Sequence, residues 1–227
     1  MNEYETKFKK YETLLREWNA RMNLVAPSTL SDIRGRHIND SAQLAQYLPH
    51  DANIIDLGSG AGFPAAVLAI LGFNVIAIES IAKKCAFLNV VKQELNLIGL
   101  TIVNDRVENA LKNNPDVRKI LNVAESPFAL QAMGDRSAGR TVFTARAFAP
   151  LVKIFDLTAG MGRPYLLLKG ESIESEIAAA REKYNFDYEL CPSETGPGFV
   201  VKIWNVKLRK NDPRKSRPFC KKAGKNL

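Results

Sequence analysis

Apolar residues recur at helical spacing near the start of the chain, and later in short blocks that alternate with helical stretches. Residues 3–19 carry an apolar residue every three or four positions: Phe8, Tyr11, Leu15 and Trp18. This spacing predicts an amphipathic helix. Ser31 is a candidate N-cap for a second helix over residues 32–46, which Pro49 ends. We expect both helices to form an N-terminal helical cap over residues 1–50.

From residue 53 onward, the pattern changes to short apolar strands separated by helical segments. The expected strands cover residues 54–57, 75–78, 101–103, 142–145, 165–168, 186–190 and 199–206. The expected helices cover residues 64–71, 82–97, 151–157 and 173–183. This alternation favours an α/β fold with a largely parallel seven-stranded sheet and helices on both faces. Gly and Pro residues at 195–198 predict a hairpin, which makes the last strand antiparallel.

One connection, between Glu108 and Thr141, is far longer than the usual ~2–6 residues. We expect a surface insertion at about residues 110–140, with a short helix over 117–123 and an exposed loop around Gly134 and Gly139. The expected domains are therefore the cap, a main domain over residues 51–206 and a flexible basic tail over residues 207–227.

The strongest candidate site follows the first expected strand. Gly58, Gly60 and Gly62 form a Gly-x-Gly-x-Gly turn that opens a helix, and Asp56 precedes the turn. Glycines at such a turn let a ligand approach the backbone closely. Glu79 ends the next strand, where a carboxylate can accept hydrogen bonds from the two hydroxyls of a ribose. We therefore expect a nucleoside cofactor at the C-terminal edge of the sheet.

The spacing of the turn also indicates which nucleoside is bound. A dinucleotide site has the spacing Gly-x-Gly-x-x-Gly and holds a pyrophosphate at a helix N-terminus. An acid at Asp56 would repel a pyrophosphate, whereas it suits the ammonium group of a methionine moiety. The turn thus favours S-adenosyl-L-methionine and a methyltransferase. The alternatives are a methyltransferase for another RNA, a protein or a small molecule, an NAD-dependent oxidoreductase, and a non-catalytic RNA-binding protein.

Charge and composition bear on the partner and the compartment. The chain has 32 Lys and Arg against 24 Asp and Glu, a formal net charge of +8, and the excess lies entirely from Lys202 onward. We expect this basic end to contact phosphates without sequence preference. The few Cys and His residues are scattered, so we expect neither a disulfide framework nor a metal site. The absence of a long apolar run or a signal-peptide core predicts a cytoplasmic protein that does not enter a membrane.

Several short motifs occur in a fixed order along the chain. They are Trp18-Asn19 with Asn23-Leu24, Arg36-His37-Ile38-Asn39-Asp40-Ser41, the glycine turn, Arg106-Val107-Glu108, Arg146-Ala147-Phe148-Ala149 and Leu168-Lys169-Gly170. In this ordered set, the chain resembles the ribosomal RNA small subunit methyltransferase G family, also called glucose-inhibited division protein B. The resemblance implies a class I, Rossmann-like S-adenosylmethionine-dependent methyltransferase fold. It also implies methylation of N7 of a guanine in the decoding region of 16S rRNA.

The resemblance further implies roles for individual residues. It assigns Gly58 and Phe63 to the methionine and sulfonium end of the cofactor, Val107 and Glu108 to the adenosine, and Arg146 to the boundary between cofactor and substrate. The full expected cofactor site is Asp56, Gly58, Gly60, Phe63, Glu79, Val107, Glu108 and Arg146. The candidates for RNA contact are Arg34, Arg36, His37, Asp40, Ser41, Lys207, Arg209 and Lys210.

The implied reaction needs no general base. Guanine N7 has a free lone pair at neutral pH, so its attack on a sulfonium methyl removes no proton. Catalysis then depends on alignment and electrostatics, and we expect Arg146, His37 and Lys169 to position the reactants. The alternative for His37 is a hydrogen-bonded structural role, and the alternative for Lys169 is solvation at a strand end. Phe148 is either a stacking surface for an unpaired base or a core aromatic. The expected partner is 16S rRNA or the small ribosomal subunit, bound by a monomer.

Overall fold

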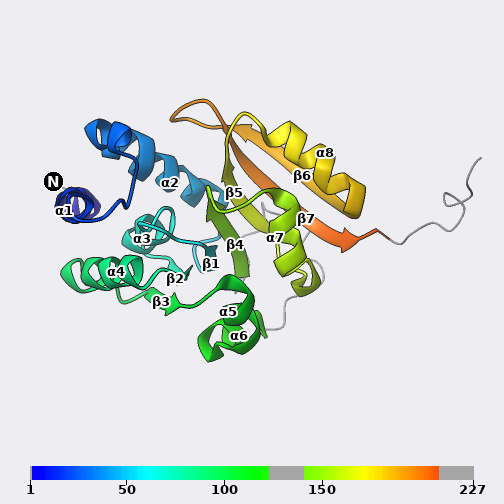
Figure 1. Ribbon diagram of the computed structural model, residues 1–227, viewed down its shortest axis with the longest axis horizontal. Helices are drawn as coiled ribbons and strands as arrows, with labels where there is room; N and C mark the ends of the chain where they lie inside the picture. The colour runs from blue at the N-terminus through cyan, green and yellow to red at the C-terminus, as the bar shows by residue number, and fades with distance from the viewer. Residues whose placement is uncertain (1, 123–140, 210–227) are drawn as a thin grey trace, which may run out of the picture.

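The computed structural model describes residues 2–122 and 141–209, and a seven-stranded sheet forms its centre (Figure 1). The strands are β1 (Asn53–Leu57), β2 (Asn74–Glu79), β3 (Leu100–Asn104), β4 (Thr141–Arg146), β5 (Tyr165–Lys169), β6 (Tyr184–Pro192) and β7 (Phe199–Leu208). Their order in the sheet is β3-β2-β1-β4-β5-β7-β6. The pairs from β3 to β5 are parallel, whereas β7 is antiparallel to both β5 and β6. The fold predicted from the sequence is confirmed, including its antiparallel last strand.

Helices cover both faces of the sheet. The cap helix α1 (Glu3–Asn19) lies on one face with α3 (Ala65–Ile70) and α4 (Ala82–Glu94). The opposite face carries α5 (Val107–Asn113), α6 (Pro115–Leu121), α7 (Leu151–Thr158) and α8 (Ile173–Lys183). Neighbouring residues of β1 divide between the two cores, with Ile54 in one and Ile55 in the other. This is why two apolar residues, Ile54 and Ile55, stand next to each other in the strand instead of alternating with polar ones.

The N-terminal segment shares a core with the sheet. Tyr11 and Leu15 of α1 are fully buried, and the Tyr11 hydroxyl donates a 2.6 Å hydrogen bond to the backbone oxygen of Ala61 in the glycine turn. Burial of this apolar stripe confirms the amphipathic helix predicted from its spacing. The cap therefore supports the turn directly, because one of its buried side chains is bonded to the turn backbone.

The prediction of a single α-helix over residues 32–46 is wrong. The chain instead forms a 3-10 turn (Pro27–Asp32), a π-helical turn (Arg34–Asn39), the short α2 (Asp40–Ala42) and another 3-10 turn (Gln43–Tyr47). Ser31 lies inside the first of these and is not an N-cap. The π turn, a form often found at functional sites, carries His37 and Ile38 into the interior.

The beginning of the long connection is more regular than the sequence suggested. Helices α5 and α6 occupy it, and the Asn114 side chain caps α6 by accepting hydrogen bonds from the N–H groups of Asp116 and Val117. Pro115 stands at the first helical position, where its missing N–H costs nothing. The loop expected around Gly134 and Gly139 lies outside the described residues.

The last strand extends two residues beyond the predicted end, to Leu208. Arg209 follows, and its side chain donates a 2.7 Å hydrogen bond to the backbone oxygen of Arg181. Because β7 is antiparallel to β5, it carries the chain away from the C-terminal edge of the parallel strands. Lys210 and the rest of the predicted tail lie outside the described residues. Across the helices that the structure describes, none is both long and apolar enough to cross a membrane.

Candidate functional site

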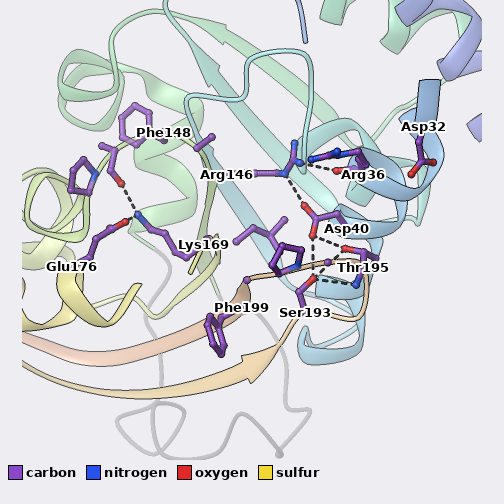
Figure 2. Close-up of a pocket in the computed structure, with 18 residues that line it drawn as sticks. Asp32, Arg36, Asp40, Arg146, Phe148, Lys169, Glu176, Ser193, Thr195 and Phe199 are labelled. Atoms are coloured by element: carbon purple, nitrogen blue, oxygen red, sulfur yellow. Dashed lines mark hydrogen bonds and ion pairs between the residues drawn. The ribbon is translucent and has the colours of Figure 1, made fainter. Parts of the chain in front are cut away.

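Two cavities open at the C-terminal edge of the parallel strands. The smaller, about 430 Å³, lies beside the glycine turn, and its walls include Gly58, Glu79, Asp105, Val107, Glu108 and Lys153. The larger, about 900 Å³, is drawn in Figure 2, and its walls include Arg36, Asp40, Arg146, Lys169, Thr195 and Phe199. Residues 147–149 line both cavities. The structure therefore places two adjoining spaces where the sequence predicted one ligand edge.

The backbone of the glycine turn is committed to internal hydrogen bonds. Gly58 and Gly60 have φ of 72° and 56°, a conformation that favours glycine. The N–H groups of Gly58 and Ser59 both donate to the backbone oxygen of Ile78, at 2.9 and 3.0 Å, and that of Gly60 donates to Glu79. These amides are the donors that would hold a pyrophosphate in a dinucleotide site. Their engagement disfavours a nicotinamide dinucleotide here.

Glu79 is fixed at the floor of the smaller cavity. Its Oε2 accepts the N–H of Gly60 at 2.9 Å, and its Oε1 accepts the N–H of Ile81 at 2.8 Å. A carboxylate has about four lone-pair positions, so acceptor capacity remains for two ribose hydroxyls. Val107 and Glu108 line the same cavity at the start of α5. Glu79, Val107 and Glu108, predicted separately from the sequence, thus meet in one space.

The charged residues that line the smaller cavity suit a positively charged ligand that has no phosphate groups. The acids Glu79, Asp105 and Glu108 line it together with Arg106 and Lys153. The pKa of Glu108 is lowered, mainly by a backbone hydrogen bond at its own position and also by Lys153, whose Nζ lies 3.3 Å from the carboxylate. Glu108 is therefore ionised at neutral pH. A nucleoside that carries a sulfonium fits these residues better than one that carries phosphates.

Asp56 is placed differently from the sequence expectation. It is fully buried and lines neither of the two cavities. Its Oδ1 accepts a 3.0 Å hydrogen bond from the hydroxyl of Thr144 on β4. Burial raises the pKa of Asp56 to about 6. The carboxylate thus lies beneath the turn, between β1 and β4, and is not aimed at a ligand's ammonium group.

Phe63 likewise belongs to the support of the turn. It is buried and lines neither of the two cavities. Its ring stacks on that of His37, with centroids 4.9 Å apart and an interplanar angle of 22°, and it also contacts Tyr11. The side chain therefore ties the glycine turn to the cap.

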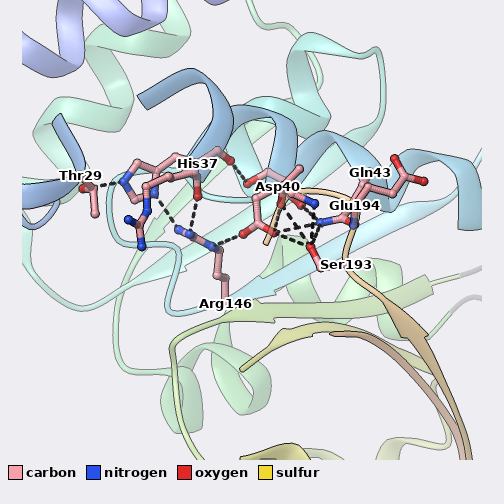
Figure 3. A network of polar contacts seen from close by, with 10 residues as sticks. Thr29, His37, Asp40, Gln43, Arg146, Ser193 and Glu194 are labelled. Atoms are coloured by element: carbon pink, nitrogen blue, oxygen red, sulfur yellow. Dashed lines mark hydrogen bonds and ion pairs between the residues drawn. The ribbon is translucent and has the colours of Figure 1, made fainter. Parts of the chain in front are cut away.

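Arg146, at the end of β4, is held by three acceptors from the cap (Figure 3). Its Nε donates to Asp40 Oδ2 at 2.8 Å, and Nη2 donates to the backbone oxygen of Arg36 at 2.7 Å. Nη1 donates to His37 Nδ1 at 2.9 Å. The guanidinium is thereby fixed in the wall of the larger cavity.

The partners of His37 define its protonation. An arginine has no acceptor, so Nδ1 must accept from Arg146 and the proton sits on Nε2, which donates to Thr29 Oγ1 at 2.8 Å. Burial, and then the charge of Arg146, lower the pKa of His37 to about 4. His37 is only 6% exposed, and Ser41 is fully buried with its hydroxyl bonded to the His37 backbone oxygen. The polar side-chain atoms of His37 and Ser41 are thus engaged within the protein, and their direct contact with RNA stays a prediction.

Asp40 joins the cap to the hairpin between β6 and β7. Its Oδ1 accepts hydrogen bonds from Thr195 Oγ1 and Gln43 Nε2, both at 2.9 Å. Ser193 lies beside them and accepts from Gln43 at 3.0 Å (Figures 2 and 3). Sequence reasoning missed Thr195 and Ser193 as site residues, although the Gly and Pro signal at 195–198 marked their loop.

Lys169 is engaged within the wall of the larger cavity. Its side chain is 9% exposed, and its Nζ donates to the backbone oxygen of Ala149 and to Glu176 Oε2, both at 2.7 Å. The same Glu176 oxygen accepts the N–H of Leu151 at the start of α7. Lys169 therefore fixes the loop after β4, which favours its structural reading.

The remaining basic residues predicted to contact RNA do not all lie at the larger cavity. Arg36 is exposed at the larger cavity, as an RNA contact requires. Arg34 instead pairs with Glu5 and Glu12 of α1. Lys207 and Arg209 lie at the end of β7, on the sheet edge opposite the cavities.

Comparisons with known proteins identify the family. The family model described as rRNA small subunit methyltransferase G matches residues 4–193. A protein of that name from Dinoroseobacter shibae is 38% identical over 197 residues, 82% of this chain and 88% of the relative. Another, from Caulobacter vibrioides, is 37% identical over 207 residues, 86% of this chain and 82% of the relative.

A solved structure supports the fold alone. The O-methyltransferase from Bacillus cereus, crystallised in complex with SAH, matches with a TM-score of 0.52 and 15% identity. The match covers 86% of this chain and 90% of that one. From the family model and the two relatives, this chain belongs to the rRNA small subunit methyltransferase G family.

Proposed function

We propose that this protein transfers the methyl group of S-adenosyl-L-methionine to N7 of a guanine in the decoding region of 16S rRNA. The observation that carries the proposal is the pair of adjoining cavities: one lies beside the glycine turn and is lined by Glu79 and Glu108, and the other is lined by Arg36, Arg146 and Lys169. Membership in a family named for methylation of small-subunit rRNA supports the substrate class.

In this proposal the smaller cavity holds the cofactor. Glu79 accepts the ribose hydroxyls, Val107 packs against the adenine, and Glu108 adds negative charge. Gly58, which has no side chain, lets the amino-acid end pass over the turn. When bound, the cofactor supplies a methyl group already activated on a positively charged sulfur.

The larger cavity then holds the guanine, and the protein contributes alignment. Arg146 already donates to three acceptors, so its part is to fix the cavity wall. Lys169 holds the backbone of Ala149 from the other side. Since N7 needs no deprotonation, rigid placement of the two reactants is the main catalytic requirement. Arg36 is exposed at the cavity, where it is placed to meet a phosphate.

The proposal extends to the organisation of the chain. We assign residues 1–50 to the cap and the chain from residue 51 to the end of β7 at Leu208 to the methyltransferase domain. The basic residues from 207 onward are assigned to sequence-independent contact with rRNA. A cytoplasmic location, a monomeric state and binding to the assembled small subunit stay predictions.

The proposal is tested by binding and transfer with the purified protein. Calorimetry should detect S-adenosyl-L-methionine and no NAD, and the methyl-labelled cofactor should transfer its label to unmodified 16S rRNA or to the small subunit carrying it. Gly58→Asp should abolish both cofactor binding and transfer. Binding of NAD without S-adenosyl-L-methionine, or an unchanged transfer rate in Gly58→Asp, would refute the assignment.

A further inference from the structure

Phe148 forms a partition between the two cavities. It belongs to the three-residue segment that lines both of them, immediately after Arg146. Its ring lies directly on Gly58: a Cβ at that glycine would be 2.3 Å from Phe148 Cδ2 and 3.0 Å from Cε2. The ring therefore occupies the space on the Cβ side of Gly58, while the rest of this part-exposed glycine lines the smaller cavity.

The backbone that carries this ring is fixed on both sides. Arg146 is held by its three acceptors before Phe148, and the Ala149 backbone oxygen accepts from Lys169 after it. Between them, Ala147 has φ of 50°, a left-handed conformation that a residue with a Cβ adopts at a cost. The backbone thus aims the ring at Gly58, and rotation of the side chain is the simplest way for the ring to leave.

A ring in this position conflicts with the proposed reaction. Methyl transfer needs the nucleophile about 3–3.5 Å from the methyl group, with an open line between the two cavities. It also needs the amino-acid end of the cofactor against Gly58, whose Cβ side Phe148 occupies. Once the smaller cavity is filled, the larger one is the space into which the ring can turn. At about 900 Å³ it is near the upper end of ordinary ligand sites and has room for both a ring and a base.

We propose that the Phe148 ring couples the two sites: the amino-acid end of the cofactor displaces it from Gly58 into the larger cavity, where its face stacks on the target guanine. The inference rests on the proposed function and adds an order of binding to it. Stacking on an aromatic side chain strengthens the binding of an unpaired base on the order of 10-fold. The cofactor should therefore raise rRNA affinity by about that factor, and linkage requires rRNA to raise cofactor affinity equally.

The test uses two probes that differ in the amino-acid end. S-adenosylhomocysteine carries that end and cannot react, whereas adenosine fills the smaller cavity without reaching over Gly58. Anisotropy of a labelled decoding-region fragment of 16S rRNA should show affinity for the intact protein rising on the order of 10-fold with saturating S-adenosylhomocysteine and unchanged with adenosine. Equal enhancement by both probes, or by neither, would overturn the coupling.

Two variants separate the ring's role from a general effect on the cavity. Phe148→Ala should bind S-adenosylhomocysteine at least as tightly as the wild type, because no ring has to be displaced, but its rRNA affinity should no longer respond. Phe199→Ala, which removes a ring that lines the larger cavity only, should keep the response. Weaker S-adenosylhomocysteine binding by Phe148→Ala, with an unchanged thermal midpoint, would make the ring a cofactor contact and overturn the proposal. Absence of S-adenosylhomocysteine binding in the wild type would instead refute the proposed function itself.

Discussion

The neutral state of His37 should make an identifiable contribution to the pH dependence of folding. His37 accepts from Arg146 at Nδ1 and donates to Thr29 from Nε2. Protonation would place a second cation 2.9 Å from the guanidinium inside a nearly closed space. His37→Gln is the matched perturbation, because a glutamine side chain also offers one acceptor and a donor but does not titrate.

The magnitude follows from the two pKa values of the imidazole. The pKa is 6.5 in the reference state and about 4 in the fold, where burial and Arg146 lower it. A lowered histidine pKa means that the unfolded chain binds the proton more tightly. The stabilisation is therefore complete above pH 6.5 and is lost as the pH falls through 4. At 1.36 kcal/mol per pH unit, His37 alone should remove about 3 kcal/mol of stability between pH 7 and pH 4.

Urea unfolding of the wild type and of His37→Gln at pH 7, 5.5 and 4 measures this contribution. Every other titrating group is present in both proteins, so its effect cancels in the difference between the two curves of free energy against pH. The wild type should lose about 3 kcal/mol more than the variant on acidification. Parallel curves would refute the assignment of His37 as a buried neutral acceptor of Arg146.

Three further predictions follow from the site. Asp56→Asn should stabilise the protein at pH 7 by at most about 3 kcal/mol in urea unfolding. Burial raises the pKa of the Asp56 carboxyl from 3.8 to about 6, so the stabilisation of the fold by the protonated carboxyl is complete below pH 3.8 and is lost as the pH rises through 6. A gain that persists at pH 3.5 would contradict this. Gly72→Ala should cost about 1–2 kcal/mol of stability, because its φ is positive, and Gly58→Ala should cost at least as much, because its φ is positive too and its Cβ would lie 2.3 Å from Phe148 Cδ2. In calorimetry only Gly58→Ala should also lose S-adenosyl-L-methionine affinity, because Gly72 faces open space; equal loss would remove the turn from the site. Truncation after Arg209 should weaken rRNA affinity and flatten its salt dependence while cofactor affinity is unchanged, and loss of both would mean that the removed segment is structural.

The parts of the fold and site that could be predicted are those encoded over short stretches of sequence. Apolar runs such as the one at Ile54 and Ile55 identify buried strands, because both faces of a parallel sheet are covered. The closeness of Gly60 and Glu79, which are joined by a hydrogen bond, could also be predicted, since the ends of adjacent parallel strands meet at one edge of the sheet.

The parts that could not be predicted depend on side-chain direction and on contacts between distant segments. Asp56 reads as a ligand-facing acid, yet it points beneath the turn to Thr144. His37 and Ser41 read as surface residues of one α-helix, but the change to a π turn buries both. The bond from Asp40 to Thr195 joins residues 155 positions apart, and no local pattern reports such a contact.

The most direct test of the central claim is a map of N7-methylguanosine in 16S rRNA from cells with and without the gene for this protein. The proposed function predicts that one guanine in the decoding region loses its N7 methyl group, and that the wild-type chain restores it while Gly58→Asp does not. An identical modification pattern in the two kinds of cells would contradict the claim.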